Sequence, residues 1–387
     1  MSTNETAGAQ RYVSIVKSSV AELKDPRVAG RTTHSLLNIV TIALFAVMSG
    51  AKDWEDIETY GKSRVAWLGG FLELPKKLPI PGDDTFRRVL SVLNPKAFSL
   101  ALFKLTQGLH EAVRGEVIAI DGKTLRGTCQ KDGHGGLHLV TAWATEMSLT
   151  LGMVPCAEKS NEITAIPELL GLLDIQGSTI TIDAMGCQVA IAQQIRDQGA
   201  HYLLGLKGNQ SGLEKDMEQL ALDGVASNFE DVKHTYHEDN SKGHGRIEER
   251  ICTAIEIPED HPQRQRWPDL RTLVVIEKHR RTPGGSNIRE WRFYISSLPP
   301  KADKLAHAIR WHWTTENRQH WNLDVSFGED TKRARDKNAL ANLAALSRLT
   351  LSLLRQEESV KTSINRKRYM CALDTSYLLK VLKCATF

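Results

Sequence analysis

The spacing of apolar and polar positions changes at about residue 110. Before it, apolar residues recur every three to four positions, which indicates amphipathic helices, and no alternating pattern typical of strands occurs. The most apolar stretch, 36–50, is shorter than a membrane span and contains three polar residues, so it predicts a buried helix. We expect residues 1–110 to form a helical N-terminal accessory domain.

After residue 110, short apolar runs of strand length appear, and segments with helical spacing separate the last three of them. The runs cover 117–121, 137–145, 149–155, 178–183 and 201–208. The first three can pair as an antiparallel meander, whereas helical crossovers place the fourth and fifth parallel to the first. This order predicts an α/β (α+β) domain with a mixed, five-stranded, ribonuclease H-like sheet flanked by helices.

The remainder of the chain interrupts this domain and then completes it. Residues 211–294 are polar and contain two β-rich segments around a glycine-rich turn, which predicts a strand-rich insertion. Two amphipathic segments follow. We therefore expect five parts: an N-terminal domain, the first part of the core, the insertion, the second part of the core and a tail, at 1–110, 111–210, 211–294, 295–356 and 357–387.

Composition excludes several classes of protein. A net charge of only +4 on 387 residues means that any nucleic-acid affinity has to come from local basic clusters, such as the one at 332–337. The six cysteines are scattered and form no CxxC pair, which argues against a zinc ribbon and against a dense disulfide framework, and fits a reducing cytoplasm. The first residues do not have the pattern of a signal peptide.

Two of the apolar runs end at an aspartate. Asp121 follows the first run and Asp183 follows the fourth. Taken singly, Asp121 before Gly122 is typical of a turn, and Asp183 is as well explained as a helix N-cap. On parallel neighbouring strands, however, both carboxylates would emerge at one sheet edge, where a hard divalent cation would relieve their repulsion.

A third carboxylate is expected from the segment HWTTENRQHW. At helical spacing, His312, Glu316, His320 and Asp324 share one face, and the tryptophans on the neighbouring stripe would anchor the helix in the core. We favour Glu316 with Mg²⁺. Two alternatives remain open: a mixed histidine and carboxylate site for zinc or another transition metal, and a third acid supplied instead by Asp324, Glu329 or Asp330.

Longer motifs around these acids point to a known family. The stretches AIDGKTLRG, TIDAMGCQ, YLLGLKGNQ and HWTTENRQHWNLDVSFGEDTKRAR resemble the DDE transposases of bacterial insertion sequences, and among them the H-repeat-associated subgroup. Similarity also extends to PGDDTFRRVLSVLNP and KRYMCALDTSYLLKVL, and so over nearly the whole chain. The resemblance implies that Asp121, Asp183 and Glu316 are the acidic triad of a ribonuclease H-like domain.

The resemblance also implies an activity and its partners. The expected reaction is metal-dependent DNA strand cleavage and strand transfer at the ends of an insertion sequence, with two Mg²⁺ ions for which Mn²⁺ can substitute. The expected partner is double-stranded DNA, as terminal inverted repeats and as target, bound in the cytoplasm by a homodimer that assembles on it, with no membrane involved. Expected DNA contacts near the acids are Lys123, Arg126, Lys207, His312, His320, Lys332, Arg333 and Arg335.

Two other functions stay open at this point. The chain could be a metal-dependent DNA nuclease without strand transfer, because both activities need the same acids. It could also be a catalytically inactive, DNA-binding relic of a transposase.

Overall fold

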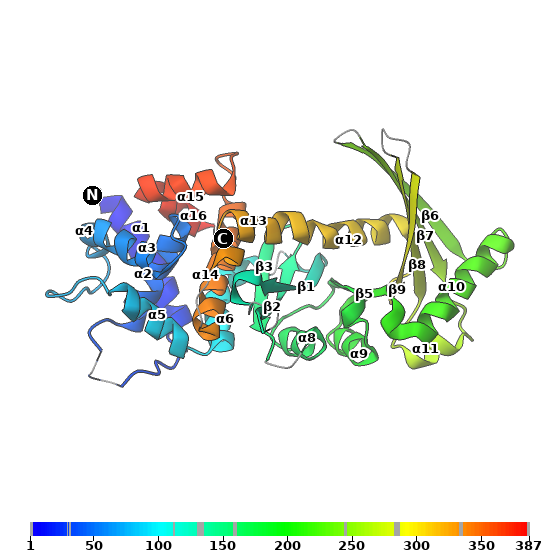
Figure 1. Ribbon diagram of the computed structural model, residues 1–387, viewed down its shortest axis with the longest axis horizontal. Coiled ribbons are helices and arrows are strands. Elements are labelled where there is room, and N and C mark those ends of the chain that lie inside the picture. Colours follow the sequence, from blue (N-terminus) through cyan, green and yellow to red (C-terminus); the bar gives the residue numbers. More distant parts are fainter. Residues whose placement is uncertain are drawn as a thin grey trace. The chain divides into compact units, whose positions relative to one another are not determined.

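The computed structural model describes residues 3–28, 30, 32–110, 113–129, 135–157, 161–243, 246–281, 287–332 and 336–384 (Figure 1). Contacts divide the chain into two compact units. The first unit contains residues 1–113, 122–160 and 316–387, and the second contains 114–121 and 161–315. The boundary crosses one strand, because β1 (Val117–Leu125) contributes its first half to the second unit and its remainder to the first.

Parallel strands joined by helical crossovers form the centre of the second unit. β1 pairs with β4 (Thr179–Ile182), and β4 pairs with β5 (His201–Leu206), both in parallel. The crossover helices are α8 (Glu162–Leu170) and α9 (Val189–Asp197). Asn161 caps the first of them by accepting a hydrogen bond from the Ile163 N–H group (3.1 Å). The predicted parallel order is confirmed.

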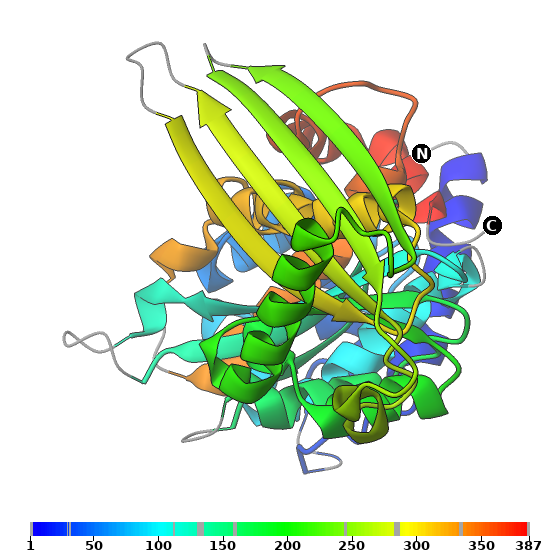
Figure 2. The ribbon, with the colours of Figure 1, turned by 90° about the vertical axis from the view of Figure 1, so that its right-hand side faces the viewer.

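The predicted strand-rich insertion begins with a helix and continues the same sheet. Its elements are α10 (Ser211–Ala226), β6 (His234–Gly243), β7 (Arg246–Glu256), α11 (Pro262–Arg266), β8 (Thr272–Arg281) and β9 (Asn287–Ser296). β9 pairs antiparallel with β5, so the strand order in this unit is β1-β4-β5-β9-β8-β7-β6. The sheet therefore extends beyond the five predicted strands, because β5 has a free edge to which β9 adds. Figure 2 shows the four long insertion strands side by side.

One helix packs against a face of this sheet. α12 (Ala302–Thr315) contacts β4, β6, β7 and β8. Its apolar side chains, among them Leu305 and Ala308, share a buried cluster with Leu203 and Val274 of the sheet. Burial of these side chains is the main term that holds the helix to the sheet.

The first unit is mostly helical. Its N-terminal helices are α1 (Thr3–Val20), α2 (Leu36–Met48), α3 (Trp54–Ser63), α4 (Val65–Leu68), α5 (Asp83–Val92), α6 (Pro95–Phe103), η1 (Lys104–Thr106) and α7 (Gln107–His110). Among the described residues up to 110 no strand occurs, which confirms the helical prediction. None of the helices that the structure describes has the length and apolar character needed to span a bilayer.

The N-terminal helices share their core with segments from the middle and end of the chain. The partners are the antiparallel pair β2 (Leu137–Ala144) and β3 (Leu149–Pro155), and the helices α14 (Lys337–Gln356), α15 (Ile364–Leu373) and α16 (Thr375–Lys383). α14 contacts α2, α5 and α6, and nearly all of its side chains are buried. Residues 1–110 therefore pack in one unit with 122–160 and 316–387. That they form a separate accessory domain stays a prediction.

Candidate active site

Asp121 and Asp183 lie on neighbouring parallel strands. The last paired residues before them are Ile120 on β1 and Ile182 on β4, and adjacent strands run about 4.8 Å apart. The turn suggested by Asp121-Gly122 is not formed, because β1 continues to Leu125. Asp121 is therefore a half-buried residue within a strand, and the interpretation of Asp121-Gly122 as a turn is wrong.

Asp183 combines an N-cap with an electrostatic environment that disfavours its charge. Its Oδ1 accepts a hydrogen bond from the Met185 N–H group (3.0 Å) and so caps the short helix η4 (Ala184–Gly186). Burial, followed by the negative charge of Glu162, raises the pKa of Asp183 above its ordinary value; backbone N–H groups and Lys207 act in the opposite direction. A divalent cation at this edge would favour the ionised carboxylate, so the pair of aspartates fits a metal ligand set.

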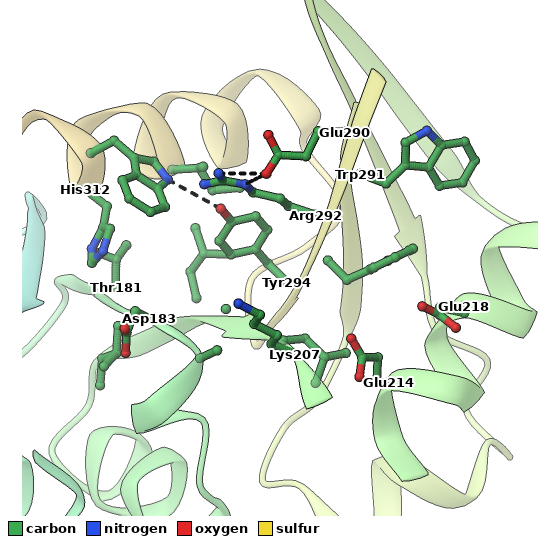
Figure 3. A pocket seen from close by; sticks show the side chains of 18 residues that line it. Thr181, Asp183, Lys207, Glu214, Glu218, Glu290, Trp291, Arg292, Tyr294 and His312 are labelled. Atoms are coloured by element: carbon green, nitrogen blue, oxygen red, sulfur yellow. Dashed lines mark hydrogen bonds and ion pairs between the residues drawn. The ribbon is translucent and has the colours of Figure 1, made fainter. Parts of the chain in front are cut away.

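A cavity of about 470 Å³ opens beside Asp183, and its lining residues all belong to the second unit. Figure 3 shows Asp183 and Lys207 on one side of it, Glu214 and Glu218 of α10 on another, and the side chains of β9 and α12 above. Lys207, at the end of β5, is exposed and its ammonium points into the cavity. The cavity is thus lined both by a candidate metal ligand, Asp183, and by a cation that can contact phosphate, Lys207.

An aromatic and cationic group closes the upper side of the cavity. The Arg292 guanidinium lies 4.8 Å from the centre of the Trp313 ring, and Trp313 Nε1–H faces the Tyr294 hydroxyl at 3.5 Å. Arg292 and Tyr294 are not among the site residues predicted from the sequence. Alternation along β9 places residues 292 and 294 on one face, but only the pairing of β9 with β5 shows that this face borders Asp183.

His312 lines the same cavity but is buried. Its Nδ1 lies 3.0 Å from the Thr181 hydroxyl on β4, two residues before Asp183. Burial lowers the pKa of His312 to about 4, so the ring is neutral at pH 7. A neutral ring offers no charge to a phosphate, and His312 is left out of the DNA contacts proposed below.

The helix that carries Glu316 presents a different face from the one predicted. The tryptophans expected in the core are exposed: Trp313 is 49% and Trp321 is 56% accessible. The buried positions include Thr315, Gln319 and Leu323 instead. The segment Glu316–His320 is π-helical (η6) and leads into α13 (Trp321–Val325). A π-turn holds more residues than an α-turn and therefore rotates the side chains that follow it, Trp321 among them, which the 3.6-residue spacing could not anticipate. Trp313 precedes the π-turn and is already exposed on α12.

Glu316 itself is exposed, with 74% of its side chain accessible, and its Oε2 lies 3.4 Å from Nδ1 of the buried His320. It belongs to the first unit, whereas Asp121 and Asp183 belong to the second. Among the described residues, no three histidine, cysteine or carboxylate side chains are gathered as a ready-made metal site. The triad as a whole, and the zinc alternative, therefore stay predictions.

The three alternative third acids are all engaged with cations in the first unit. Lys123 Nζ lies 2.7 Å from Asp324 Oδ1 and 3.2 Å from Asp330 Oδ1. Glu329 Oε1 lies 2.6 Å from the Arg348 guanidinium, and both of those side chains are fully buried. These pairs favour Glu316, whose carboxylate is accessible, as the third acid.

The remaining predicted DNA contacts differ in accessibility. Arg126 is 86% exposed, and Lys332 is half-buried. Lys123, by contrast, is only 8% exposed. Arg333 and Arg335 lie outside the described residues.

Comparison with known proteins identifies relatives over most of the chain. A family model described as "Transposase DDE domain" matches residues 114–353, and one described as "DDE_Tnp_1-associated" matches 17–106. The chain is 39% identical over 370 residues (94% of this chain, 93% of the relative) to "Putative transposase YncI" of Escherichia coli O157:H7. It is 35% identical over 372 residues (94% and 96%) to "H repeat-associated putative transposase YhhI" of E. coli K12. A shorter match, 36% over 67 residues (17% and 77%), is to "Inactive transposase YbfQ" of E. coli K12.

Proposed function

Because the chain belongs to the DDE transposase family, we propose that it cuts DNA strands at the ends of an insertion sequence and transfers them to target DNA. The family is one of enzymes that act on DNA, has a ribonuclease H-like fold and generally uses divalent metal ions. The observation that carries the proposal is the position of Asp121 and Asp183, which directly follow paired residues of two parallel strands. Carboxylates at the carboxyl ends of parallel strands are placed for ligand binding.

The proposed metal ligands are Asp121, Asp183 and Glu316. Two Mg²⁺ ions, or Mn²⁺ in their place, would lower the pKa of the attacking water or 3′-hydroxyl and neutralise charge on the scissile phosphate. The capping bond from Met185 fixes one oxygen of Asp183 and leaves the second as a ligand. The exposed side chain of Glu316 can turn toward DNA-bound metal and would give up its 3.4 Å contact with His320 in doing so.

Basic residues would hold the DNA. Lys207, in the cavity beside Asp183, and the exposed Arg126 are proposed to contact phosphates, together with His320, Lys332, Arg333 and Arg335. We further propose that the N-terminal helices bind the terminal inverted repeats, that a homodimer assembles on the DNA, and that the protein works in the cytoplasm.

The test is cleavage of a duplex that carries the element's terminal repeat, with Mg²⁺ and then with Mn²⁺. We expect Asp121→Asn, Asp183→Asn and Glu316→Gln to abolish cleavage while the proteins stay folded, since an asparagine oxygen at position 183 can still accept the capping bond. The matched control is Asp197→Asn, because Asp197 is an exposed aspartate on α9 that accepts a hydrogen bond from the side chain of Gln193. Wild-type cleavage rates in the Asp183→Asn variant would show that the triad is wrong.

Two other functions predict different results. A nuclease without strand transfer cuts the repeat but gives no joined product when a pre-cut 3′-hydroxyl end and target DNA are supplied together. An inactive relic binds no Mg²⁺ in calorimetry, even with DNA present. One relative is itself named an inactive transposase.

A further inference from the structure

Lys123 is placed unlike a DNA-contacting lysine. It stands two residues after Asp121 on β1, and alternation along a strand puts both side chains on the same face of the sheet. It is 8% exposed, and its ammonium lies within 3.2 Å of two carboxylates, those of Asp324 and Asp330. All three side chains of this cluster belong to the first unit.

The two carboxylates come from the segments that follow Glu316. Asp324 lies on α13, and Asp330 lies on the short helix η7 (Glu329–Thr331). Asp330 Oδ1 also accepts a hydrogen bond from the Arg126 N–H group (3.1 Å), so one carboxylate bonds both the side chain of Lys123 and the backbone just after β1.

The backbones themselves approach closely at this place. A Cβ atom on Gly127 would lie 2.4 Å from the carbonyl oxygen of Lys332 and 2.7 Å from that of Asp330. Only glycine fits there, so the turn just after β1 and the segment 330–332 pack without a side chain between them. The ion pairs of Lys123 thus belong to a continuous contact between β1 and the region after Glu316.

The charges around Lys123 exclude a phosphate as its natural partner. The Lys123 ammonium already faces two carboxylates, one of which also lies 3.7 Å from the Arg126 guanidinium, so a phosphate that approached Lys123 would meet the negative charge of both carboxylates. Breaking these largely buried contacts to free the lysine would leave Asp324 without its cation and Asp330 with only the exposed Arg126 guanidinium, 3.7 Å away.

We propose that Lys123 is a positioning residue: with Asp324 and Asp330 it fixes the strand that carries Asp121 to the helical segment that carries Glu316. This inference rests on the proposed function of those two acids. It assigns Lys123, Asp324 and Asp330 to the geometry of the reaction and not to DNA affinity. Displacements of about 1 Å in such a supporting contact can reduce a rate about 100-fold.

The test compares Lys123→Met, Asp324→Asn and Asp330→Asn in two assays. Single-turnover cleavage at saturating DNA and Mg²⁺ should fall about 10- to 100-fold in each variant. DNA affinity measured in EDTA, and its dependence on salt concentration, should stay at wild-type values. Lys123→Met combined with Asp324→Asn should be no slower than Lys123→Met alone, because the pair is already broken.

A phosphate contact would give the opposite result. The slope of log K against log salt would fall by about 0.9 in Lys123→Met, with an unchanged saturated rate, and that outcome would overturn the proposal. Lys207→Met, which removes an exposed ammonium from the cavity and leaves this cluster intact, shows what a reduced slope looks like in this protein. Lys233→Met is the matched control for loss of a lysine–carboxylate pair elsewhere, since Lys233 Nζ lies 3.3 Å from a Glu256 oxygen on the surface.

Two further variants of the experiment keep it decisive. If Lys123→Met does not fold, Asp330→Asn still tests the proposal, because an asparagine oxygen can accept the Arg126 N–H bond while the charge is lost. If the wild type cuts no DNA, the proposed function fails but the contact is still tested by hydrogen exchange. Asp324→Asn and Lys123→Met should then speed exchange of the Arg126 amide about 10-fold or more, and unchanged exchange would overturn the proposal.

Discussion

The buried ion pair between Arg348 and Glu329 allows a quantitative test of the first unit. The guanidinium and carboxylate are 2.6 Å apart, and their side chains are 1% and 0% exposed. Arg348 Nε–H also donates to the hydroxyl of Thr141 on β2 (3.2 Å). The pair therefore connects α14, β2 and η7 in the interior of the unit.

Replacement of one partner leaves the other charge buried without compensation. Arg348→Met should lower the free energy of unfolding by about 3–5 kcal/mol, which is the usual cost of breaking a buried pair from one side. Replacement of both partners by apolar residues, as in Arg348→Met with Glu329→Leu, should recover most of this loss and bring stability to within about 1–2 kcal/mol of the wild type.

Urea unfolding gives the magnitudes, and hydrogen exchange of α14 amides shows whether the change occurs in the first unit. A single variant that loses less than about 1 kcal/mol, or a double variant as unstable as the single one, would refute this reasoning. The double variant has a second use. If it folds and still cleaves DNA, Glu329 is not the third acid.

Two further predictions concern single residues. Burial lowers the pKa of His312 to about 4, so between pH 6.5 and 4 the unfolded ring binds a proton that the folded ring does not. The free energy of unfolding is therefore highest above pH 6.5, and this group alone lowers it by about 3 kcal/mol as the pH falls to 4. Urea unfolding at pH 7 and about pH 4.5 should show a smaller loss for His312→Phe, and equal losses would contradict the assignment. Gly127→Ala forces a methyl group against the Lys332 carbonyl oxygen and should destabilise the protein by about 1–3 kcal/mol. Thermal unfolding measures this loss, with Gly212→Ala as the control. No atom lies within 4 Å of the carbon added at Gly212, so that variant should change stability by less than about 1 kcal/mol.

The sheet and its two aspartates were predictable because both depend on local patterns. An apolar run of strand length that stops at a charge identifies the end of a buried strand, and the intervening helices determine the parallel order. The match of 149–155 with β3, and the pairing of β1 with β4, follow from these patterns alone.

The helix around Glu316 and the role of Lys123 were not predictable in the same way. The π-turn at 316–320 depends on packing in three dimensions and shifts the side chains that follow it, whereas Trp313 is already exposed on α12, before that turn. The partners of Lys123 lie as far as 207 positions along the chain, so no local pattern indicates that its charge is matched. A lysine beside a predicted metal ligand suggests a phosphate contact until those partners are known.

Charge matching also explains why these carboxylates are not equivalent as metal ligands. Asp324, Asp330 and Glu329 each face an internal cation, so binding a metal ion would require them to give up an existing ion pair.

Asp183 lies beside the negative charge of Glu162, and its raised pKa means that an added cation stabilises its ionised form. Glu316 is exposed, and among the described residues its carboxylate pairs with a histidine, so it can bind a metal ion at little cost. Metal affinity should therefore depend on Asp183 and Glu316, whereas neutralising Asp324 should change the rate through Lys123 and leave the number of bound ions unchanged.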